Sequence, residues 1–183
     1  MRYYPALTFW SIVGIITLSM LLYYLGDQVF MLVETFPFNQ QITRYLRSSA
    51  TIEGKEEAFS ENMERIDRIL PVNLGTQSVD DLFFELPDRM KPKKTSDVRF
   101  VAFLDWSSIP YKPYYDSSGK STAILASQSV CHIRVVDIQK GKLLARKTIE
   151  GDLPPDRIRS HQSGDGPRPT EAVVNYLEKL IDP

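Results

Sequence analysis

The sequence VRFVAFLDW, residues 98–106, decides the fold of the folded part of this 183-residue chain. Most of its side chains are apolar, and β-branched and aromatic types dominate it. This pattern is typical of a strand that is buried on both faces of a sheet. We therefore predict a central strand here and interpret the neighbouring segments by what they would add to it.

Two further strands are predicted downstream, joined as a hairpin. Ser121–Ile138 and Leu143–Ile149 are both strand-like runs, and Lys140-Gly141 lies between them. Glycine adopts the positive φ that a tight hairpin turn requires, so this dipeptide predicts the turn. The proline- and tyrosine-rich stretch 107–120 (SSIPYKPYYDSSGK) is predicted to be a loop before the hairpin.

Amphipathic helices are predicted on both sides of these strands, from apolar residues that recur at helical spacing. The predicted helices are 38–50 with Ile42, Tyr45 and Leu46 on one side, 59–70 with Phe59, Met63, Ile66 and Leu70, 79–86 with Ser78 as its N-cap, and 170–182 with Val173, Tyr176, Leu177 and Leu180. Pro71 is expected to end the second helix, and Glu64–Arg68 to form an i, i+4 pair on its polar face.

The N-terminal segment has the composition of a membrane anchor. Residues 6–25 read ALTFWSIVGIITLSMLLYYL, and no charge occurs between Arg2 and Asp27. Twenty residues of helix span about 30 Å, which matches the hydrocarbon core of a bilayer. A cleaved signal peptide is the competing interpretation, but its apolar region is usually shorter and a small-residue cleavage site follows it. We expect an uncleaved transmembrane helix, with 29–33 continuing it or lying in the interface until Pro37 stops it.

The basic residues around the span predict its orientation. Arg2 and the α-amino group lie on the short side, and the first basic residue on the long side is Arg44. Lys and Arg close to a span favour the cytoplasmic side. We therefore expect a cytoplasmic N-terminus and an extracytoplasmic C-terminal domain.

Together these elements predict an α+β protein: an N-terminal transmembrane helix followed by a small, mainly antiparallel sheet packed against amphipathic helices. The expected organisation is an anchor at 1–37, a helical segment and linker at 38–96, and an α+β domain at 97–183 that comprises the strand, the β-hairpin and the C-terminal helix.

The composition argues against several classes of function. The 22 Lys and Arg residues balance 23 Asp and Glu residues, whereas nucleic-acid-binding proteins carry a basic excess. A single cysteine, Cys131, permits neither an internal disulfide nor a cysteine-based zinc cluster, and there are only two histidines. Gly119-Lys120-Ser121 imitates the end of a P-loop, but Tyr114 stands where that motif requires its first glycine. No cofactor and no metal site are predicted.

One stretch is singled out as a candidate partner surface. Within 109–115, two prolines restrict the backbone, and Tyr111, Pro113, Tyr114 and Tyr115 provide large side chains that are already held in place. Aromatic residues that lose little entropy on binding are good contact residues. The alternative is that the tyrosine rings fold back onto the edge of the sheet.

Two functions from different classes remain open. The favoured hypothesis is a non-enzymatic, single-pass membrane protein, anchored in the lipid bilayer through 6–25, whose domain binds a protein partner in the cell envelope. The hairpin sequence IRVVDIQKGKLLARKTI is similar in general character to hairpins of exported envelope domains. The alternative is a membrane-tethered, hydrolase-like enzyme with a site near His132, Asp137 and His161, which requires these side chains to converge in space.

Overall fold

The computed structural model describes residues 17, 20, 25, 26, 29–50, 66–115, 121–155 and 165–181. The chain divides into two compact units, Met1–Pro37 and Phe38–Pro183. The predicted anchor at 6–25 lies almost entirely outside the described residues. Within the described part of the chain, no helix is both long enough and apolar enough to cross a membrane.

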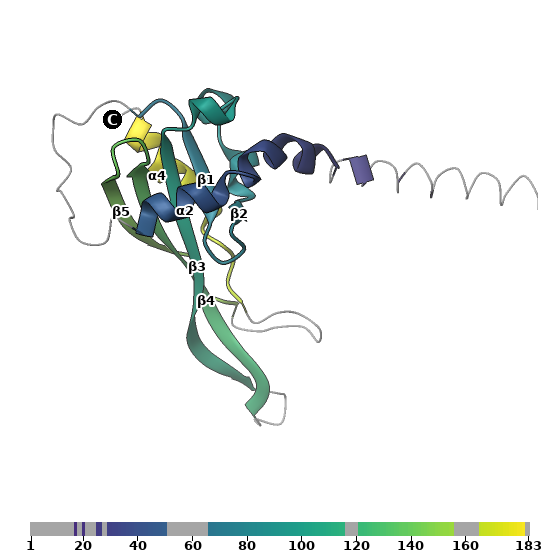
Figure 1. Ribbon diagram of the computed structural model, residues 1–183. Helices are drawn as coiled ribbons and strands as arrows, with labels where there is room; N and C mark the ends of the chain where they lie inside the picture. Colours follow the sequence, from purple (N-terminus) through teal and green to yellow (C-terminus); the bar gives the residue numbers. More distant parts are fainter. Residues whose placement is uncertain are drawn as a thin grey trace, which may run out of the picture. The chain divides into compact units, whose positions relative to one another are not determined.

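The second unit is an α+β domain built on a five-stranded mixed sheet (Figure 1). Its strands are β1 (Ile69–Asn73), β2 (Ser78–Val79), β3 (Phe100–Tyr115), β4 (Ser121–Asp137) and β5 (Lys142–Glu150), in the spatial order β2-β1-β3-β4-β5. Only β1 and β3 run parallel, and every other neighbouring pair is antiparallel. The prediction of a small, mainly antiparallel sheet in an α+β fold is confirmed.

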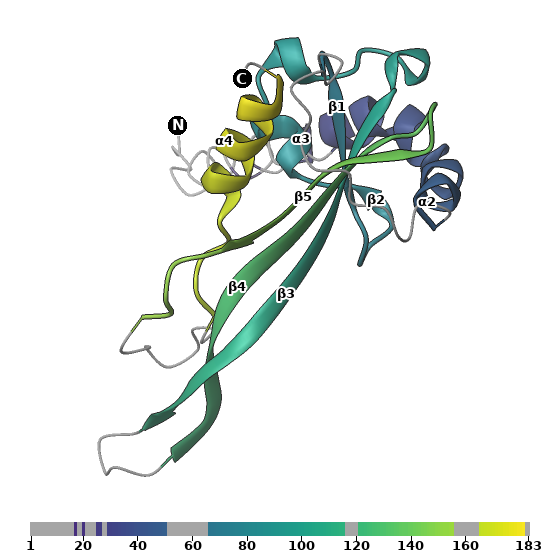
Figure 2. The same ribbon diagram turned by 90° about the vertical axis from the view of Figure 1, so that its left-hand side faces the viewer.

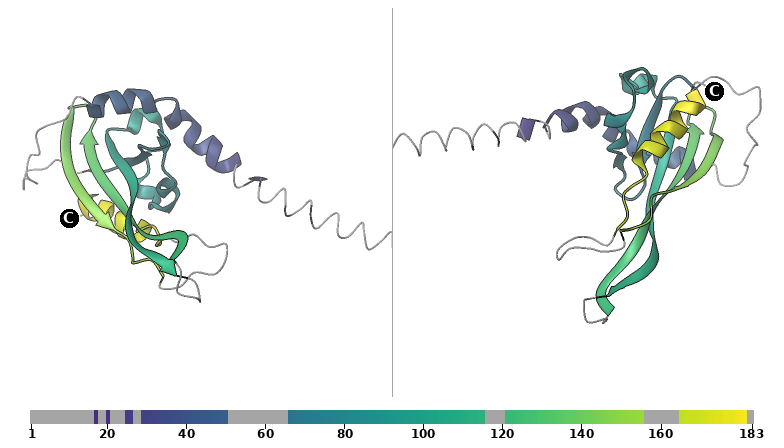
Figure 3. Two further views of the ribbon diagram at one scale, coloured as in Figure 1. Left: turned by 90° about the horizontal axis from the view of Figure 1, so that it is seen from below. Right: turned by 180° about the vertical axis from the view of Figure 1, so that it is seen from behind.

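Helices cover both faces of this sheet. They are α2 (Ile42–Ala50), α3 (Leu82–Glu85) and α4 (Thr170–Ile181), with short 3₁₀ turns at Asp88–Met90 and Thr95–Asp97. Figure 3 shows α2 and α4 on opposite sides of the strands. Residues 29–39 of the chain are also helical.

The alternation of side chains along β3 explains why the sheet needs helices on both faces. Phe100, Ala102 and Leu104 belong to one buried cluster, together with apolar residues of α3 and α4. Val101 and Phe103 belong to a second cluster, which includes Ile42 and Tyr45 of α2. All five strand residues are at most 2% exposed, so the predicted burial of this strand on both faces is confirmed.

Local sequence signals also place the hairpin and the last helix. Gly141 has a φ of 63° in the turn between β4 and β5, as the hairpin prediction required. In α4, Val173, Leu177 and Leu180 are buried on one side, as predicted from their spacing.

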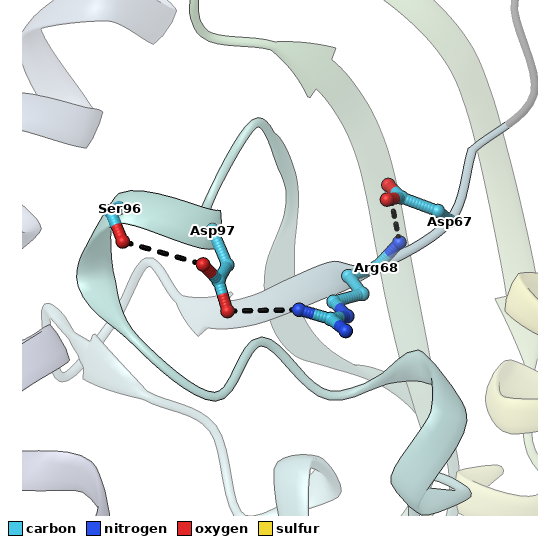
Figure 4. Close-up of polar contacts among 4 residues, drawn as sticks. All are labelled: Asp67, Arg68, Ser96 and Asp97. Atoms are coloured by element: carbon cyan, nitrogen blue, oxygen red, sulfur yellow. Dashed lines mark hydrogen bonds and ion pairs between the residues drawn. The ribbon is translucent and has the colours of Figure 1, made fainter.

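The predicted helix at 59–70 is wrong at its C-terminal end. Residues 51–65 lie outside the described residues, but Ile69 and Leu70 are in β1, and Pro71 lies within that strand. Arg68, just before β1, pairs with Asp97 at 2.8 Å (Figure 4). Burial of β1 against β3 decides the conformation, because this parallel pairing joins residues about 30 positions apart, which helical periodicity does not detect.

Two predicted helix boundaries are also wrong. Ser78 does not cap a helix, since it lies in β2. The helix begins at Leu82, whose backbone N–H donates to the carboxylate of Asp80 at 2.9 Å. Pro37 does not end its helix either, since helical backbone continues to residue 39. Pro37 removes one i→i−4 hydrogen bond and its ring crowds the carbonyl of Val33, and the helix ends two residues later.

Candidate functional site

The most distinctive feature of the domain is an arm formed by β3 and β4. Pairing of β1 with β3 ends at Leu104, and pairing of β4 with β5 ends at Val130. Beyond these positions the two strands continue to pair with each other, from Ser107 opposite Val130 to Tyr115 opposite Ser121. Figure 2 shows this two-stranded arm extending past the rest of the sheet.

The candidate surface at 109–115 was predicted to be a loop, and this prediction is wrong because the stretch is the outer half of β3. Pro110 is compatible with pairing to β4. The carbonyl oxygen of Leu104 accepts the N–H of Leu74 at 2.9 Å, so the backbone groups of Leu104 face β1. Backbone groups alternate sides along a strand, which places the nitrogen of Pro110 on the same outer edge. The missing N–H of this proline therefore leaves no gap in the ladder, and a proline on an edge also hinders pairing with another strand.

The tyrosines of this stretch lie in different surroundings. Tyr111 is 51% exposed, and the ammonium group of Lys112 lies 5.5 Å from the centre of its ring. Tyr114 is only 5% exposed, and its hydroxyl donates to the carbonyl oxygen of Pro155 at 2.7 Å. Pro113 is half-buried opposite Leu125, and the side chain of Tyr115 lies outside the described residues. The ring of Tyr111 is therefore exposed, whereas Tyr114 packs within the domain.

Two apolar residues accompany Tyr111 on the outer part of the arm. Ile109 is 48% exposed and Leu125 is 57% exposed. We call Ile109, Tyr111 and Leu125 the arm surface; Ile109 pairs with Gln128, so it lies on the face of the ribbon opposite to that of Leu125, and the apolar side chains surround the arm. Sequence reasoning missed Leu125, because strand alternation placed it on the face of Cys131 and Ile133, which are fully buried. The sheet and helices that cover those two residues do not extend as far as the end of the arm (Figure 2).

A strap of two chain segments holds the base of the arm. Gly151 donates its N–H to the carbonyl oxygen of Ser129, and Gly166 donates to that of Ser127, each at 2.7 Å. The Ser129 hydroxyl donates back to the carbonyl oxygen of Gly166 at 2.8 Å, and the Ser127 hydroxyl bonds to the carboxylate of Asp165. These bonds attach 151–155 and 165–169 to the free edge of β4.

Both glycines of the strap are required by close backbone contacts. A Cβ on Gly151 would lie 2.5 Å from the carbonyl oxygen of Pro167. A Cβ on Gly166 would lie 2.6 Å from that of Asp152. The two segments of the strap thus contact each other through their backbones. An isolated two-stranded ribbon is marginally stable, so this support allows the arm to hold its shape.

The residues of the enzyme hypothesis do not converge in the described structure. His132 is exposed on β4, and its Nδ1 lies 3.0 Å from the hydroxyl oxygen of Thr148. Asp137 is five residues further along the same strand, which places it on the other face and about 17 Å away. The carboxylate opposite His132 across the ladder is Asp105. His161 lies outside the described residues.

Asp137 has a structural role at the end of β4. Its carboxylate is 1% exposed, and Oδ2 accepts hydrogen bonds from the guanidinium of Arg99 at 2.8 and 2.9 Å. Its other oxygen accepts the backbone N–H groups of Gln139 and Lys140 at 3.0 Å each. These bonds fix the turn that leads into β5.

Cys131 and Asp80 are likewise part of the packed interior. Cys131 is fully buried, and its burial raises the pKa of its thiol to about 12, with the negative charges of Asp80 and Asp105 adding to the effect. The thiol is therefore neutral at physiological pH and a poor nucleophile. Asp80 is 5% exposed and accepts hydrogen bonds from Asn73 Nδ2 at 3.0 Å and Trp106 Nε1 at 2.8 Å. This carboxylate, just after β2, links β1 and β3 and also accepts the N–H of Leu82 at the start of α3.

No group of three or more His, Cys, Asp or Glu side chains among the described residues has an arrangement that would hold a metal ion. No protein-family model, curated protein or solved structure matches this chain.

Proposed function

We propose that this protein is a single-pass membrane protein whose extracytoplasmic α+β domain binds another protein of the cell envelope through the arm surface. The observation that carries the proposal is the arm, where Ile109, Tyr111 and Leu125 are about half exposed on a ribbon that the strap holds in place. Apolar and aromatic side chains on a preorganised support lose little entropy on binding, and a central one contributes about 2 kcal/mol or more.

The anchor at 6–25 and the orientation of the chain belong to the same proposal. Support comes from the length of the uncharged apolar run and from the position of Arg2 before it. Full-length protein should stay in the membrane pellet after an alkaline carbonate wash, because burial of apolar surface and not charge holds it there. Release by salt alone would contradict the anchor.

Orientation is tested with a membrane-impermeant thiol reagent on Leu153→Cys, a position that is 57% exposed. The native thiol, Cys131, is fully buried and gives a low background. We expect labelling of intact cells. Labelling only after lysis would reverse the topology.

The partner surface is tested by site-specific photo-crosslinking in intact membranes. A photoreactive side chain at Tyr111 or Leu125 should give one discrete adduct, and the same group at the exposed Lys147 on β5 should not. Ile109→Ser should reduce the adduct formed from Tyr111, two residues further along the same strand, without lowering the melting temperature, since exposed positions contribute little to the core. Equal crosslinking from all three positions would contradict a defined site.

One observation supports a second candidate, a membrane-tethered hydrolase. Asp105, His132 and Thr148 are ladder partners on three adjacent strands, and the imidazole contacts the threonine hydroxyl. A hydrolase of this kind would lose ester hydrolysis in His132→Ala, whereas the binding protein proposed above would keep its crosslinked adduct unchanged in that variant.

A further inference from the structure

The helix at residues 29–39 exposes large apolar side chains over its first two turns. The exposed fractions are 56% for Val29, 65% for Phe30, 39% for Met31, 65% for Leu32, 67% for Val33 and 61% for Phe36. Six exposed apolar side chains within eight residues are more apolar surface than a helix of a soluble protein usually presents to water.

Helical geometry places most of these side chains on one broad arc. With about 100° between successive residues, Leu32, Phe36, Val29, Val33 and Phe30 fall within an arc about 160° wide. Glu34, the one charged residue of 29–36, lies about 120° from the centre of that arc. A wide apolar arc with the charged side chain outside it is typical of a helix that lies in a membrane interface.

The polar group next to Glu34 is bonded within the helix itself. Thr35 is 7% exposed, and its hydroxyl donates to the carbonyl oxygen of Met31 at 2.9 Å. Thr35 lies about 140° from the centre of the apolar arc, so the side of the helix that protein covers is the side away from that arc.

We propose that residues 29–36 lie at the boundary between lipid headgroups and acyl chains, with the apolar arc toward the acyl chains and Glu34 toward water. This inference rests on the proposed anchor at 6–25. Residue 29 follows the end of that span by four residues and so lies within about 6 Å of it along a helix. Because the segment continues from a proposed transmembrane span, lipid is the expected partner of its apolar arc.

The length of the segment also constrains its direction. A straight continuation along the membrane normal would carry Phe36 about 16 Å beyond residue 25. The interfacial layer is only about 5–7 Å deep on each side of the hydrocarbon core. Contact with lipid along the whole of 29–36 therefore requires its axis to lean toward the membrane plane.

Spin labels on single added cysteines in the full chain test this placement, with the protein reconstituted in nanodiscs of phosphatidylcholine and phosphatidylglycerol in equal parts. The labelled variants are Phe30→Cys, Val33→Cys and Phe36→Cys, with Glu34→Cys as their polar counterpart. Met20→Cys reports on the anchor and Lys93→Cys on water. The buried thiol of Cys131 should stay unlabelled, which the parent chain checks.

Collision rates with molecular oxygen and with a water-soluble nickel chelate then separate the outcomes. We expect the oxygen-to-chelate ratio at 30, 33 and 36 to be several-fold higher than at Glu34→Cys and Lys93→Cys. A low oxygen-to-chelate ratio at 30, 33 and 36, together with a high ratio at Met20→Cys, would overturn this inference and leave the anchor intact. Chelate access at Met20→Cys as well would overturn the anchor. Low access to both reagents at 30, 33 and 36 would show that protein covers the arc, for example a second copy, and would also overturn the inference.

Discussion

The hydroxyl of Tyr114 donates a hydrogen bond of 2.7 Å to the carbonyl oxygen of Pro155, 41 residues further along the chain. This bond joins the outer half of β3 to the first segment of the strap. It shows that an aromatic residue in a proline-rich stretch can support the arm from within, whereas Tyr111, three residues earlier, is half exposed.

The two tyrosines should therefore respond differently to loss of the hydroxyl group. Tyr114→Phe should cost about 1 kcal/mol of unfolding free energy, which lowers the melting temperature by about 2–4 °C. Tyr111→Phe should change the unfolding free energy by less than about 0.5 kcal/mol, as surface substitutions usually do. Thermal melts of both variants check this, and equal melting temperatures would show that the bond to Pro155 does not stabilise the arm.

Alanine at either strap glycine should destabilise the domain. In Gly151→Ala and Gly166→Ala the new Cβ would lie within 2.6 Å of a backbone carbonyl oxygen, so the segments must move apart, at a cost of about 1–3 kcal/mol. Gly141→Asn is the matched control. A Cβ added at Gly141 would have no heavy atom of another part of the chain within 4 Å, and asparagine tolerates the positive φ of this position. Urea unfolding measures all three, and a stable Gly151→Ala would refute the close contact.

The Arg99–Asp137 pair should be worth more than the Arg68–Asp97 pair, because the carboxylate of Asp137 is buried and that of Asp97 is not. Among the described residues, Arg99→Met leaves the Asp137 carboxylate with the two backbone donors Gln139 and Lys140 and should cost about 2–3 kcal/mol. Arg68→Met should cost less than about 1 kcal/mol, as expected for a more exposed pair. Denaturant midpoints at neutral pH compare the two. Similar losses would mean that burial of Asp137 does not set the strength of its pair.

Stability should fall in alkaline solution because of Cys131. Burial holds the pKa of its thiol at about 12 in the folded chain, against 9.0 for an ordinary cysteine. Between these values the unfolded chain releases a proton that the folded chain keeps, so the unfolding free energy decreases as pH rises above about 9. Below that pH both states are protonated and the effect is absent.

Cys131→Ala should make this decline shallower. Some slope should remain, because burial also raises the pKa of Tyr45 and Tyr176. Denaturant titrations from neutral to alkaline pH measure it, and identical slopes in the parent and the variant would exclude the thiol as a cause.

Elements whose signal is local could be predicted from the sequence. The apolar residues around Phe103 predict the central strand, Gly141 predicts the turn, and the spacing of Val173 and Leu177 predicts α4. Each depends on neighbours within a few positions, so periodicity and turn chemistry are sufficient. Tyr111 and Ile109 are about half exposed, and a contact surface at 109–115 remains a prediction.

Tertiary contacts alone decided the remaining features. Leu70 and Pro71 are in a strand and not in a helix because β3, about 30 residues away, buries them. The outer half of β3 is a strand despite two prolines because β4 pairs with its other edge. Tyr114 is buried because the strap covers it, although its place in a proline-rich stretch suggests exposure. Leu125 is exposed because the sheet ends before it, although strand alternation places it on the buried face. The sequence by itself shows which side chains are apolar and will be removed from water. Which distant segment covers each of them depends on the packing of the whole chain.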